Sequence, residues 1–317
     1  MRQTSRKPFT RRNIALFLVS LAAVSLLSAC RPPFAPRVIF ARPAVLTQTA
    51  SATLPVDTAT PVPPTATPSP IPATPTPVGC QEPNGRVETR VFETELFPKP
   101  ITVNLYLPPC YDPTAETPYP LVILLHGQSY THEQWLDLNL PQAADHLITS
   151  KQAAPFIVAM PREEYYLQDY LDSKYGSALI QGLLPWLSAE ANACGEARCR
   201  AIGGISRGAG WAALLAFENP GTVSAVGAHS IPNPPFSDYR LFYLLGLTPE
   251  GQVPRVYVDT GTSDRYFSGA QRFVRLLEEY EIDHLWLQAD GAHNNEYWAA
   301  HMPEYMAWYA AQIAPPQ

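Results

Sequence analysis

The sequence predicts one α/β domain, in which helices cover both faces of a mostly parallel sheet of about eight strands and a short lid insertion roofs the pocket. Two observations carry this prediction. From Cys80 onward, short apolar segments rich in β-branched residues alternate with segments of helical period. Most of the later apolar segments are unbroken, which is typical of strands buried on both faces of a sheet. We therefore expect residues 80–317 to form the folded domain.

The elements follow in order along this domain. The expected strands are 86–94, 101–107, 120–126, 155–161, 199–206, 223–230, 255–261 and 284–290. The expected helices are 133–149, 177–192, 207–218, 267–281 and 295–312. The first two strands should form an antiparallel hairpin, and the later strands should be joined by crossover helices. Residues 231–252 are the insertion, and its aromatic side chains either line the site or pack the insertion onto the domain; they are Phe236, Tyr239, Phe242 and Tyr243.

The amino terminus has the layout of an export signal. Residues 1–13 carry five basic and no acidic side chains, and an uncharged apolar run follows that ends at Cys30. The last four residues of this stretch, Leu27-Ser28-Ala29-Cys30, resemble a bacterial lipobox. This resemblance implies that residues 1–29 are a lipoprotein signal peptide and that Cys30 carries the lipid. An uncleaved apolar anchor is the alternative, and both readings place the rest of the chain outside the cytoplasm, on the surface of a bacterial membrane.

Residues 30–79 form a different region, with 13 prolines and 9 threonines after Cys30. Proline fixes φ and removes amide donors, so this region predicts an extended stalk rather than a packed core. Without residues 1–29 the net charge changes from −6 to −11, because that segment holds five basic residues and no acidic ones. The mature chain is therefore not expected to bind nucleic acid.

Four cysteines remain once Cys30 is assigned to lipidation. An even number in an oxidising compartment predicts two disulfides, and the positions around the expected hairpin and one short loop favour the pairs Cys80–Cys110 and Cys194–Cys199. Metal binding is the alternative for these cysteines, although no histidine spacing accompanies them.

The chemistry is indicated by Gly204-Ile205-Ser206-Arg207-Gly208. The motif G-x-S-x-G lies between an expected strand and an expected helix, which is the context of a nucleophilic serine. A glycine-rich turn without function is the alternative, because this motif alone occurs often by chance. A serine hydroxyl also needs an imidazole that accepts its proton and a carboxylate that orients the imidazole.

Candidates for both groups follow later strands. Asp264 and His293 each lie in a loop at the carboxyl end of an expected strand, where sites in open α/β sheets form. Two other aspartates fit less well, because Asp259 is within its strand and Asp290 is too close in sequence to His293. The competing histidine is His229, at the end of the sixth strand. We therefore expect the catalytic residues to be Ser206, Asp264 and His293.

Two backbone amides should stabilise the oxyanion of the tetrahedral intermediate. One is that of Arg207, which follows the nucleophile, and the other is that of Gln128, in the loop after the third strand. His126, two residues earlier, is expected to be a structural, hydrogen-bonded residue rather than a proton shuttle.

These motifs together resemble the esterase D and feruloyl esterase branch of the α/β-hydrolases, which is itself similar to mycolyltransferases. The resemblance covers essentially all of 80–317. Its matching stretches are Leu105–Pro109, Leu124–Gly127 with Trp135, Pro155–Pro161, Gly204–Gly208, Gly261–Asp264 and Gly291–His293 with Tyr297-Trp298. It implies an α/β-hydrolase fold and the roles given above, and we expect Tyr130, Trp298 and Phe236 to contact substrate.

Three positions depart from the resemblance: Arg207 stands where family members commonly have methionine, Ala209 where they have a second glycine, and Gly182 where they have a glutamate. A cation beside the nucleophile leads to the hypothesis that acidic acyl or sugar substrates are favoured.

The predicted function is hydrolysis of carboxylic esters through an acyl-enzyme, with acyl or feruloyl esters of carbohydrates as substrates. The alternatives are an acyltransferase of the same fold and a catalytically inactive surface binding module. No cofactor or metal is expected. The expected partners are an ester substrate and, through the lipid, the membrane, and the protein is expected to be a monomer.

Overall fold

The computed structural model describes residue 80 and residues 82–164 and 167–313. The expected signal peptide 1–29, the lipidation site Cys30 and the stalk up to residue 79 lie outside the described residues. Within the described part of the chain, no helix is both long enough and apolar enough to span a membrane.

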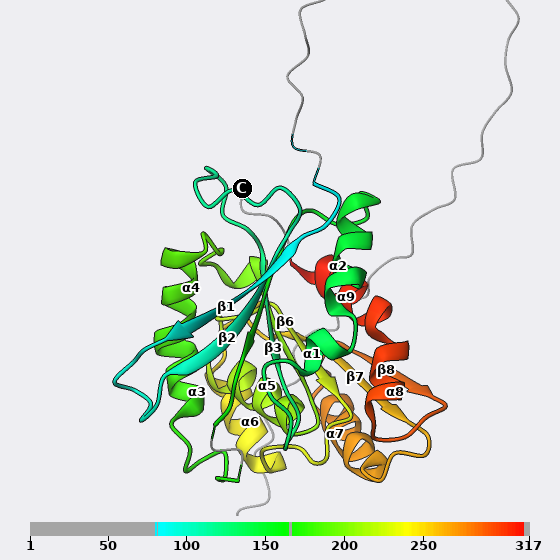
Figure 1. Ribbon diagram of the computed structural model, residues 1–317. Coiled ribbons are helices and arrows are strands. Elements are labelled where there is room, and N and C mark those ends of the chain that lie inside the picture. The colour runs from blue at the N-terminus through cyan, green and yellow to red at the C-terminus, as the bar shows by residue number, and fades with distance from the viewer. Residues whose placement is uncertain (1–79, 81, 165–166, 314–317) are drawn as a thin grey trace, which may run out of the picture. The chain divides into compact units, whose positions relative to one another are not determined.

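Eight strands form one sheet, as the sequence predicts (Figure 1). The strands are β1 (Arg86–Phe92), β2 (Ile101–Leu107), β3 (Leu121–Leu125), β4 (Ile157–Pro161), β5 (Arg200–Ile205), β6 (Ala225–His229), β7 (Arg255–Gly261) and β8 (His284–Ala289). Their order in the sheet is β1-β2-β4-β3-β5-β6-β7-β8. The pairs β1/β2 and β2/β4 are antiparallel, and all other neighbouring strands are parallel.

The direction of winding changes beside β3. The chain passes from β3 to β4 on one side, and then crosses to β5 on the other side before it continues to β8. In open α/β sheets, ligands bind outside the carboxyl ends of the strands at such a switch point. The topology therefore directs the search for a site to the loops after β3 and β5.

The central strands form because both of their faces are buried. Along β3, Leu121, Ile123 and Leu125 belong to one hydrophobic cluster, whereas Val122 and Leu124 belong to the other. Successive side chains of a strand point to opposite faces, so each face of the sheet has its own core. This is the physical reason why these strands are unbroken apolar segments in the sequence.

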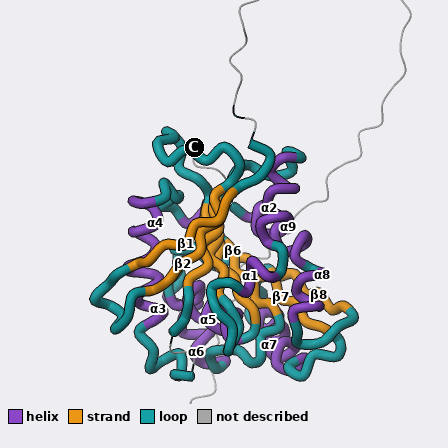
Figure 2. The backbone as a smooth tube through the Cα atoms, in the orientation of Figure 1, coloured by secondary structure: helices purple, strands orange, loops and turns teal. Residues whose placement is uncertain are grey.

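Helices lie on both faces (Figure 2). One face carries α3 (Tyr175–Ser177), the π-helical turn η2 (Ala178–Leu183), α4 (Leu184–Glu190), α5 (Arg207–Glu218), α6 (Asp238–Leu247) and α7 (Phe267–Glu279). The other face carries α1 (Gln134–Asp137), α2 (Leu140–Thr149), α8 (Asn295–Ala300) and α9 (Met302–Gln312). A single 3-10 turn, η3 (Ala197–Cys199), precedes β5. The fold is the predicted α/β architecture.

Two of the expected helices are each divided in two. The segment 133–149 breaks at Asn139, whose φ of 63° is left-handed, and Pro141 then occupies the first turn of α2. The segment 295–312 breaks at His301, and Pro303 occupies the first turn of α9. Proline lacks an amide hydrogen and is tolerated in a first turn, where that hydrogen has no partner within the helix.

The insertion 231–252 contains a helix that the sequence analysis did not predict. Helix α6 begins after Ser237, whose side chain accepts a hydrogen bond from the Arg240 amide at 3.3 Å. Only Leu241 of this helix is buried. A helix with a single buried residue has almost no amphipathic pattern, which explains why its period was not visible in the sequence.

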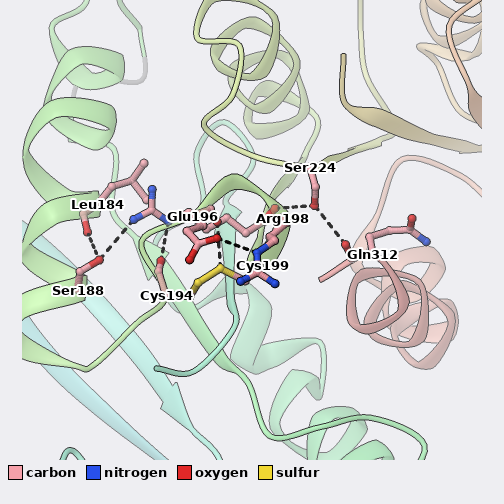
Figure 3. The surroundings of a disulfide bond; sticks show 9 residues. Leu184, Ser188, Cys194, Glu196, Arg198, Cys199, Ser224 and Gln312 are labelled. Atoms are coloured by element: carbon pink, nitrogen blue, oxygen red, sulfur yellow. Dashed lines mark hydrogen bonds and ion pairs between the residues drawn. A yellow bond between two sulfur atoms is a disulfide. The ribbon is translucent and has the colours of Figure 1, made fainter. Parts of the chain in front are cut away.

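Both predicted disulfides, Cys80–Cys110 and Cys194–Cys199, are present. The first links the chain ahead of β1 to the residues after β2. The second closes the loop between α4 and β5 (Figure 3). Beside it, the buried Arg200 guanidinium donates from Nε to the Cys194 carbonyl at 2.7 Å. Because their sulfurs are bonded to one another, these cysteines do not offer thiolates to a metal ion.

Candidate active site

Ser206 occupies the sharp turn between β5 and α5. Its φ of 55° and ψ of −115° are an unusual conformation for a residue with a side chain. A Cβ on Gly204 would overlap the backbone of Gly208, and a Cβ on Gly208 would overlap the backbone of Leu125 and His126. Both glycines of the motif are therefore required by direct contact between backbone segments. The turn leaves Ser206 buried to all but 8 % of its surface, at the wall of a cavity.

A chain of hydrogen bonds joins Ser206 to the other two predicted residues. Ser206 Oγ and His293 Nε2 are 2.9 Å apart, and His293 Nδ1 lies 2.9 Å from Oδ2 and 3.1 Å from Oδ1 of Asp264. The loops after β7 and β8 that carry the acid and the histidine are themselves joined, because the Ser263 amide donates to the Gly291 carbonyl at 2.8 Å. The structure thus brings together three side chains that lie far apart in the sequence.

The Asp264 carboxylate is held in its ionised form. Burial raises its pKa, but hydrogen bonds from His293, from the Tyr266 amide at 2.7 Å and from Ser230 outweigh burial, and the pKa lies below its ordinary value. The Ser230 hydroxyl also accepts from Trp298 Nε1 at 3.0 Å. A carboxylate that stays ionised can fix the Nδ1–H tautomer of His293 and leave Nε2 free to accept the serine proton.

The two expected oxyanion donors flank Ser206. The Arg207 amide opens α5, and the Gln128 residue lines the same cavity as Ser206. Among the described residues, neither amide donates to another protein group. The loop before Gln128 is fixed, because the Gly127 amide donates to Gln134 Oε1 at 2.7 Å and the Glu163 amide donates to His126 Nε2 at 2.8 Å.

His126 has the structural role that was expected from the sequence. Its Nε2 accepts the Glu163 amide hydrogen, so its proton is on Nδ1, which donates to the Gly127 carbonyl at 2.8 Å. Burial lowers the pKa of His126, which favours this neutral form. Its ring therefore holds the loop that carries Gln128, the expected oxyanion donor.

The cavity beside Ser206 has a volume of about 310 Å³. Its walls are Gly127, Gln128, Ser129, Tyr130, Ser206, Arg265, Tyr266, His293 and Trp298. Three of these are aromatic, and the rings of Tyr266 and Trp298 both lie edge-on to His293, with centroids 4.8 and 5.0 Å from it. The cavity is thus small, and its lining combines flat aromatic rings with polar side chains.

Comparison with known proteins identifies the family. The Esterase family model matches residues 94–309, more than half of the chain. This chain belongs to the esterase family. It is a serine esterase of the α/β-hydrolase fold.

Solved structures of similar fold carry related activities. A ferulic acid esterase is 20 % identical, with a TM-score of 0.64, and the match covers 73 % of this chain and 99 % of that one. The feruloyl esterase module of Clostridium thermocellum, complexed with sinapinate, is 16 % identical with a TM-score of 0.62, over 77 % and 93 % of the two chains. The S-formylglutathione hydrolase of Staphylococcus aureus is 15 % identical with a TM-score of 0.60, over 73 % and 98 %.

This esterase contains a second histidine–aspartate pair, which lies in the core. His229 Nδ1 is 2.6 Å from Asp259 Oδ1, and neither side chain is exposed. The other carboxylate oxygen accepts from the hydroxyls of Tyr297 at 2.9 Å and Tyr305 at 2.7 Å, and His229 Nε2 is 2.8 Å from the Tyr309 hydroxyl. Each polar side-chain atom of this network thus has a hydrogen-bond partner. His229, the competing candidate for the base, therefore faces Tyr309 and not Ser206.

The Arg207 side chain of the esterase does not face the cavity. Its guanidinium makes two hydrogen bonds to the Glu163 carboxylate, at 2.9 and 2.6 Å, and lies 4.8 Å from the centre of the Tyr170 ring. Burial by itself lowers the pKa of Arg207, but the pair with Glu163 outweighs burial and raises the pKa. The hypothesis that Arg207 attracts acidic substrates is therefore not supported, because a neighbouring carboxylate already neutralises the cation.

The expected substrate contacts lie in different places. Tyr130 and Trp298 line the cavity, but Phe236 packs in the core against Phe217 and Phe273, with ring centroids 5.6 and 6.2 Å away. The expectation that Phe236 contacts substrate is thus corrected: the insertion uses its first aromatic ring to attach itself to the domain. The other three aromatic residues, all on α6, do not line this cavity.

Among the residues at or behind the site that sequence reasoning missed, three come from the loops after β6 and β7. Arg265 and Tyr266 follow Asp264 and line the cavity, and Ser230 follows β6 and donates to Asp264. All three lie in loops at the carboxyl ends of neighbouring strands. Their position in the sequence could have indicated them, because the loops at the carboxyl ends of parallel strands form the site.

Proposed function

We propose that this esterase hydrolyses carboxylic esters through an acyl-enzyme, with Ser206 as nucleophile, His293 as general base and Asp264 as the residue that orients His293. The observation that carries the proposal is the continuous chain of hydrogen bonds from Ser206 Oγ through both nitrogens of His293 to the buried Asp264 carboxylate. This geometry matches the requirement that nucleophile, base and orienting acid lie within hydrogen-bond reach of one another.

The reaction proceeds in two steps. Ser206 Oγ attacks the ester carbonyl while His293 Nε2 accepts its proton, and the carbonyl oxygen becomes an oxyanion near the Gln128 and Arg207 amides. The C–O bond to the alcohol then breaks, and His293 returns the proton to the departing alcohol. Water repeats the sequence in the second step and releases the acid. The loss of one such amide costs about 10²–10³ in rate in enzymes of this mechanism.

The substrate class that the cavity favours is a short or planar acyl group esterified to a carbohydrate. Flat walls from Tyr130, Tyr266 and Trp298 suit an aromatic acyl ring or a sugar face, and the small volume disfavours a long aliphatic chain. The similar structures that are named as feruloyl or ferulic acid esterases agree with this substrate class.

A substrate panel tests the proposal. Initial rates on p-nitrophenyl esters of increasing chain length, on methyl ferulate and on acetylated xylan should be highest for short or aromatic acyl groups and zero for Ser206→Ala. Product analysis with an added sugar acceptor separates hydrolysis from transfer, since free acid is expected to exceed the transfer product. A chain that binds the esters without turnover, and that reacts with no fluorophosphonate, would be a binding module instead.

We also propose that the protein is a lipoprotein attached through Cys30 to the outer face of a bacterial membrane, on the pattern of residues 1–30. Metabolic labelling with an alkyne fatty acid should mark the wild-type protein and not Cys30→Ser. Label on the Cys30→Ser chain would reject this part of the proposal.

A further inference from the structure

The two oxyanion amides lie on separate segments of the chain. Gln128 is in the loop after β3, whereas Arg207 opens α5 after β5. Each amide must point to the same oxygen, and a displacement of about 1 Å can cost 10²-fold in rate. Something must therefore fix the distance between these two segments.

Glu163, in the loop after β4, contacts both of them. Its amide donates to His126 Nε2 at 2.8 Å, two residues before Gln128. Its carboxylate accepts two hydrogen bonds from the Arg207 guanidinium and one from Trp211 Nε1, at 2.9 Å, one turn further along α5. Among the hydrogen bonds that the side chains of His126 and Arg207 make to described residues, Glu163 is the one partner they share.

The contacts of Glu163 are rigid because they are buried. Only 3 % of the Glu163 side chain and 11 % of the Arg207 side chain are exposed. Arg207 is also fixed by the Gln168 carbonyl, at 2.7 Å from Nη2, and the Tyr170 hydroxyl donates to the Arg207 carbonyl at 3.1 Å. A buried bidentate pair has one geometry, in contrast to an exposed pair whose partners move freely.

We propose that Glu163 is a positioning residue of the oxyanion hole, which sets the Arg207 amide relative to the Gln128 amide. The inference rests on the proposed function, because these two amides are assigned to the tetrahedral intermediate of acyl transfer. It also explains the departure at position 207: the arginine serves as the partner of Glu163 on α5, and its charge is not directed at substrate. Glu163 acts through Arg207 and His126 and does not itself touch the reacting atoms.

The test compares Glu163→Gln with Glu164→Gln. Glu164 is a matched control, because it is the next residue, carries the same side chain and pairs with the partly exposed Arg162 at 3.1 Å instead of Arg207. Each variant is assayed on p-nitrophenyl acetate, with active sites counted by a fluorophosphonate, and with a trifluoromethyl ketone inhibitor. The ketone forms a tetrahedral adduct with Ser206, so its Ki reports the quality of the oxyanion hole, whereas KM reports binding of the planar ester.

Glu163→Gln should lower kcat by roughly 10- to 100-fold. KM should change less than threefold, and Ki for the ketone should rise in the same proportion as kcat/KM falls. Glu164→Gln should match the wild type in all three constants. Arg207→Met, which removes the pair from the other side, should act in the same direction. The double variant should be no slower than the worse single variant, because both substitutions remove one interaction.

The result that overturns the inference is a Glu163→Gln enzyme whose kcat and Ki equal those of Glu164→Gln. A second result would also overturn it: both Glu163→Gln and Arg207→Met have fewer active sites that react with the fluorophosphonate, but kcat, KM and Ki per active site are normal. The pair would then only stabilise the fold. If the proposed function itself is wrong, the result is different, because the wild type would neither hydrolyse the ester nor bind the ketone.

Discussion

Two histidine–aspartate pairs lie near Ser206, and they should respond in opposite ways to the same substitution. Asp264 pairs with His293 at the cavity, whereas Asp259 pairs with His229 in the core. In Asp259→Asn the amide nitrogen must replace one of the carboxylate oxygens. In either orientation of the amide, the Tyr297 and Tyr305 hydroxyls lose their charged acceptor.

The cost follows from the hydrogen bonds that are lost. Each of the two hydrogen bonds to a charged group contributes about 1.5–3 kcal/mol to stability. When the hydroxyls reorient and bond to the asparagine amide instead, part of this free energy is recovered. We therefore expect Asp259→Asn to lower the free energy of unfolding by about 3 kcal/mol. Its kcat per active site should remain within a few-fold of the wild type, because His293 and Asp264 are untouched.

Asp264→Asn should behave in the reverse manner. The asparagine stabilises the wrong tautomer of His293, and the equivalent change in a serine enzyme lowers kcat by roughly 10⁴-fold while its geometry stays intact. Urea unfolding followed by tryptophan fluorescence measures the first effect, and kcat per site titrated with a fluorophosphonate measures the second. The reasoning is refuted if Asp259→Asn abolishes turnover in folded protein, or if Asp264→Asn retains it.

Three further predictions address single residues. Ser230→Ala removes a donor to Asp264 and should lower kcat/KM for p-nitrophenyl acetate about tenfold and the free energy of unfolding by about 1–2 kcal/mol; unchanged constants would show that Ser230 does not support the acid. Arg265 lines the cavity, so Arg265→Gln should reduce the preference for p-nitrophenyl succinate over p-nitrophenyl butyrate, measured as the ratio of their kcat/KM values, by up to about fivefold, the limit for an exposed charge pair. Added salt should lower the same ratio in the wild type. The pKa of His126 in the folded protein lies below its value of about 6.5 in the unfolded chain, so the unfolded chain binds the proton first as the pH falls. The stability that His126 contributes is therefore present above about pH 6.5 and is lost as the pH falls through the folded pKa. The free energy of unfolding should thus fall less between pH 7 and pH 5 in His126→Gln than in the wild type, and an equal fall in both would remove His126 as the cause.

The sequence alone predicts the sheet and the three central residues because both are set by local rules. Buried parallel strands must be continuously apolar, and a nucleophilic serine in a tight turn needs glycines such as Gly204 and Gly208, whose Cβ atoms would overlap neighbouring backbone. The acid and the histidine follow from the rule that sites form at the carboxyl ends of parallel strands.

What the sequence analysis missed depends on contacts between distant residues. Nothing near Arg207 in the sequence shows that Glu163 will neutralise it, and nothing near Phe236 shows that it will pack against Phe217 and Phe273. The role of Ser230 likewise appears only when β6 lies beside β7 and its hydroxyl reaches Asp264. Charge partners and the packing of an insertion are tertiary properties, which a periodic pattern does not record.

The most direct test of the central claim is to identify the residue that becomes acylated. The protein is mixed with an activated ester, quenched with acid within milliseconds and digested, and the acyl group is located by mass spectrometry. We expect a single acyl group on Ser206, formed in one-to-one proportion with the burst of released alcohol, and no acyl group in Ser206→Ala. An acyl group on any other residue, or steady hydrolysis without one, would contradict the proposed mechanism.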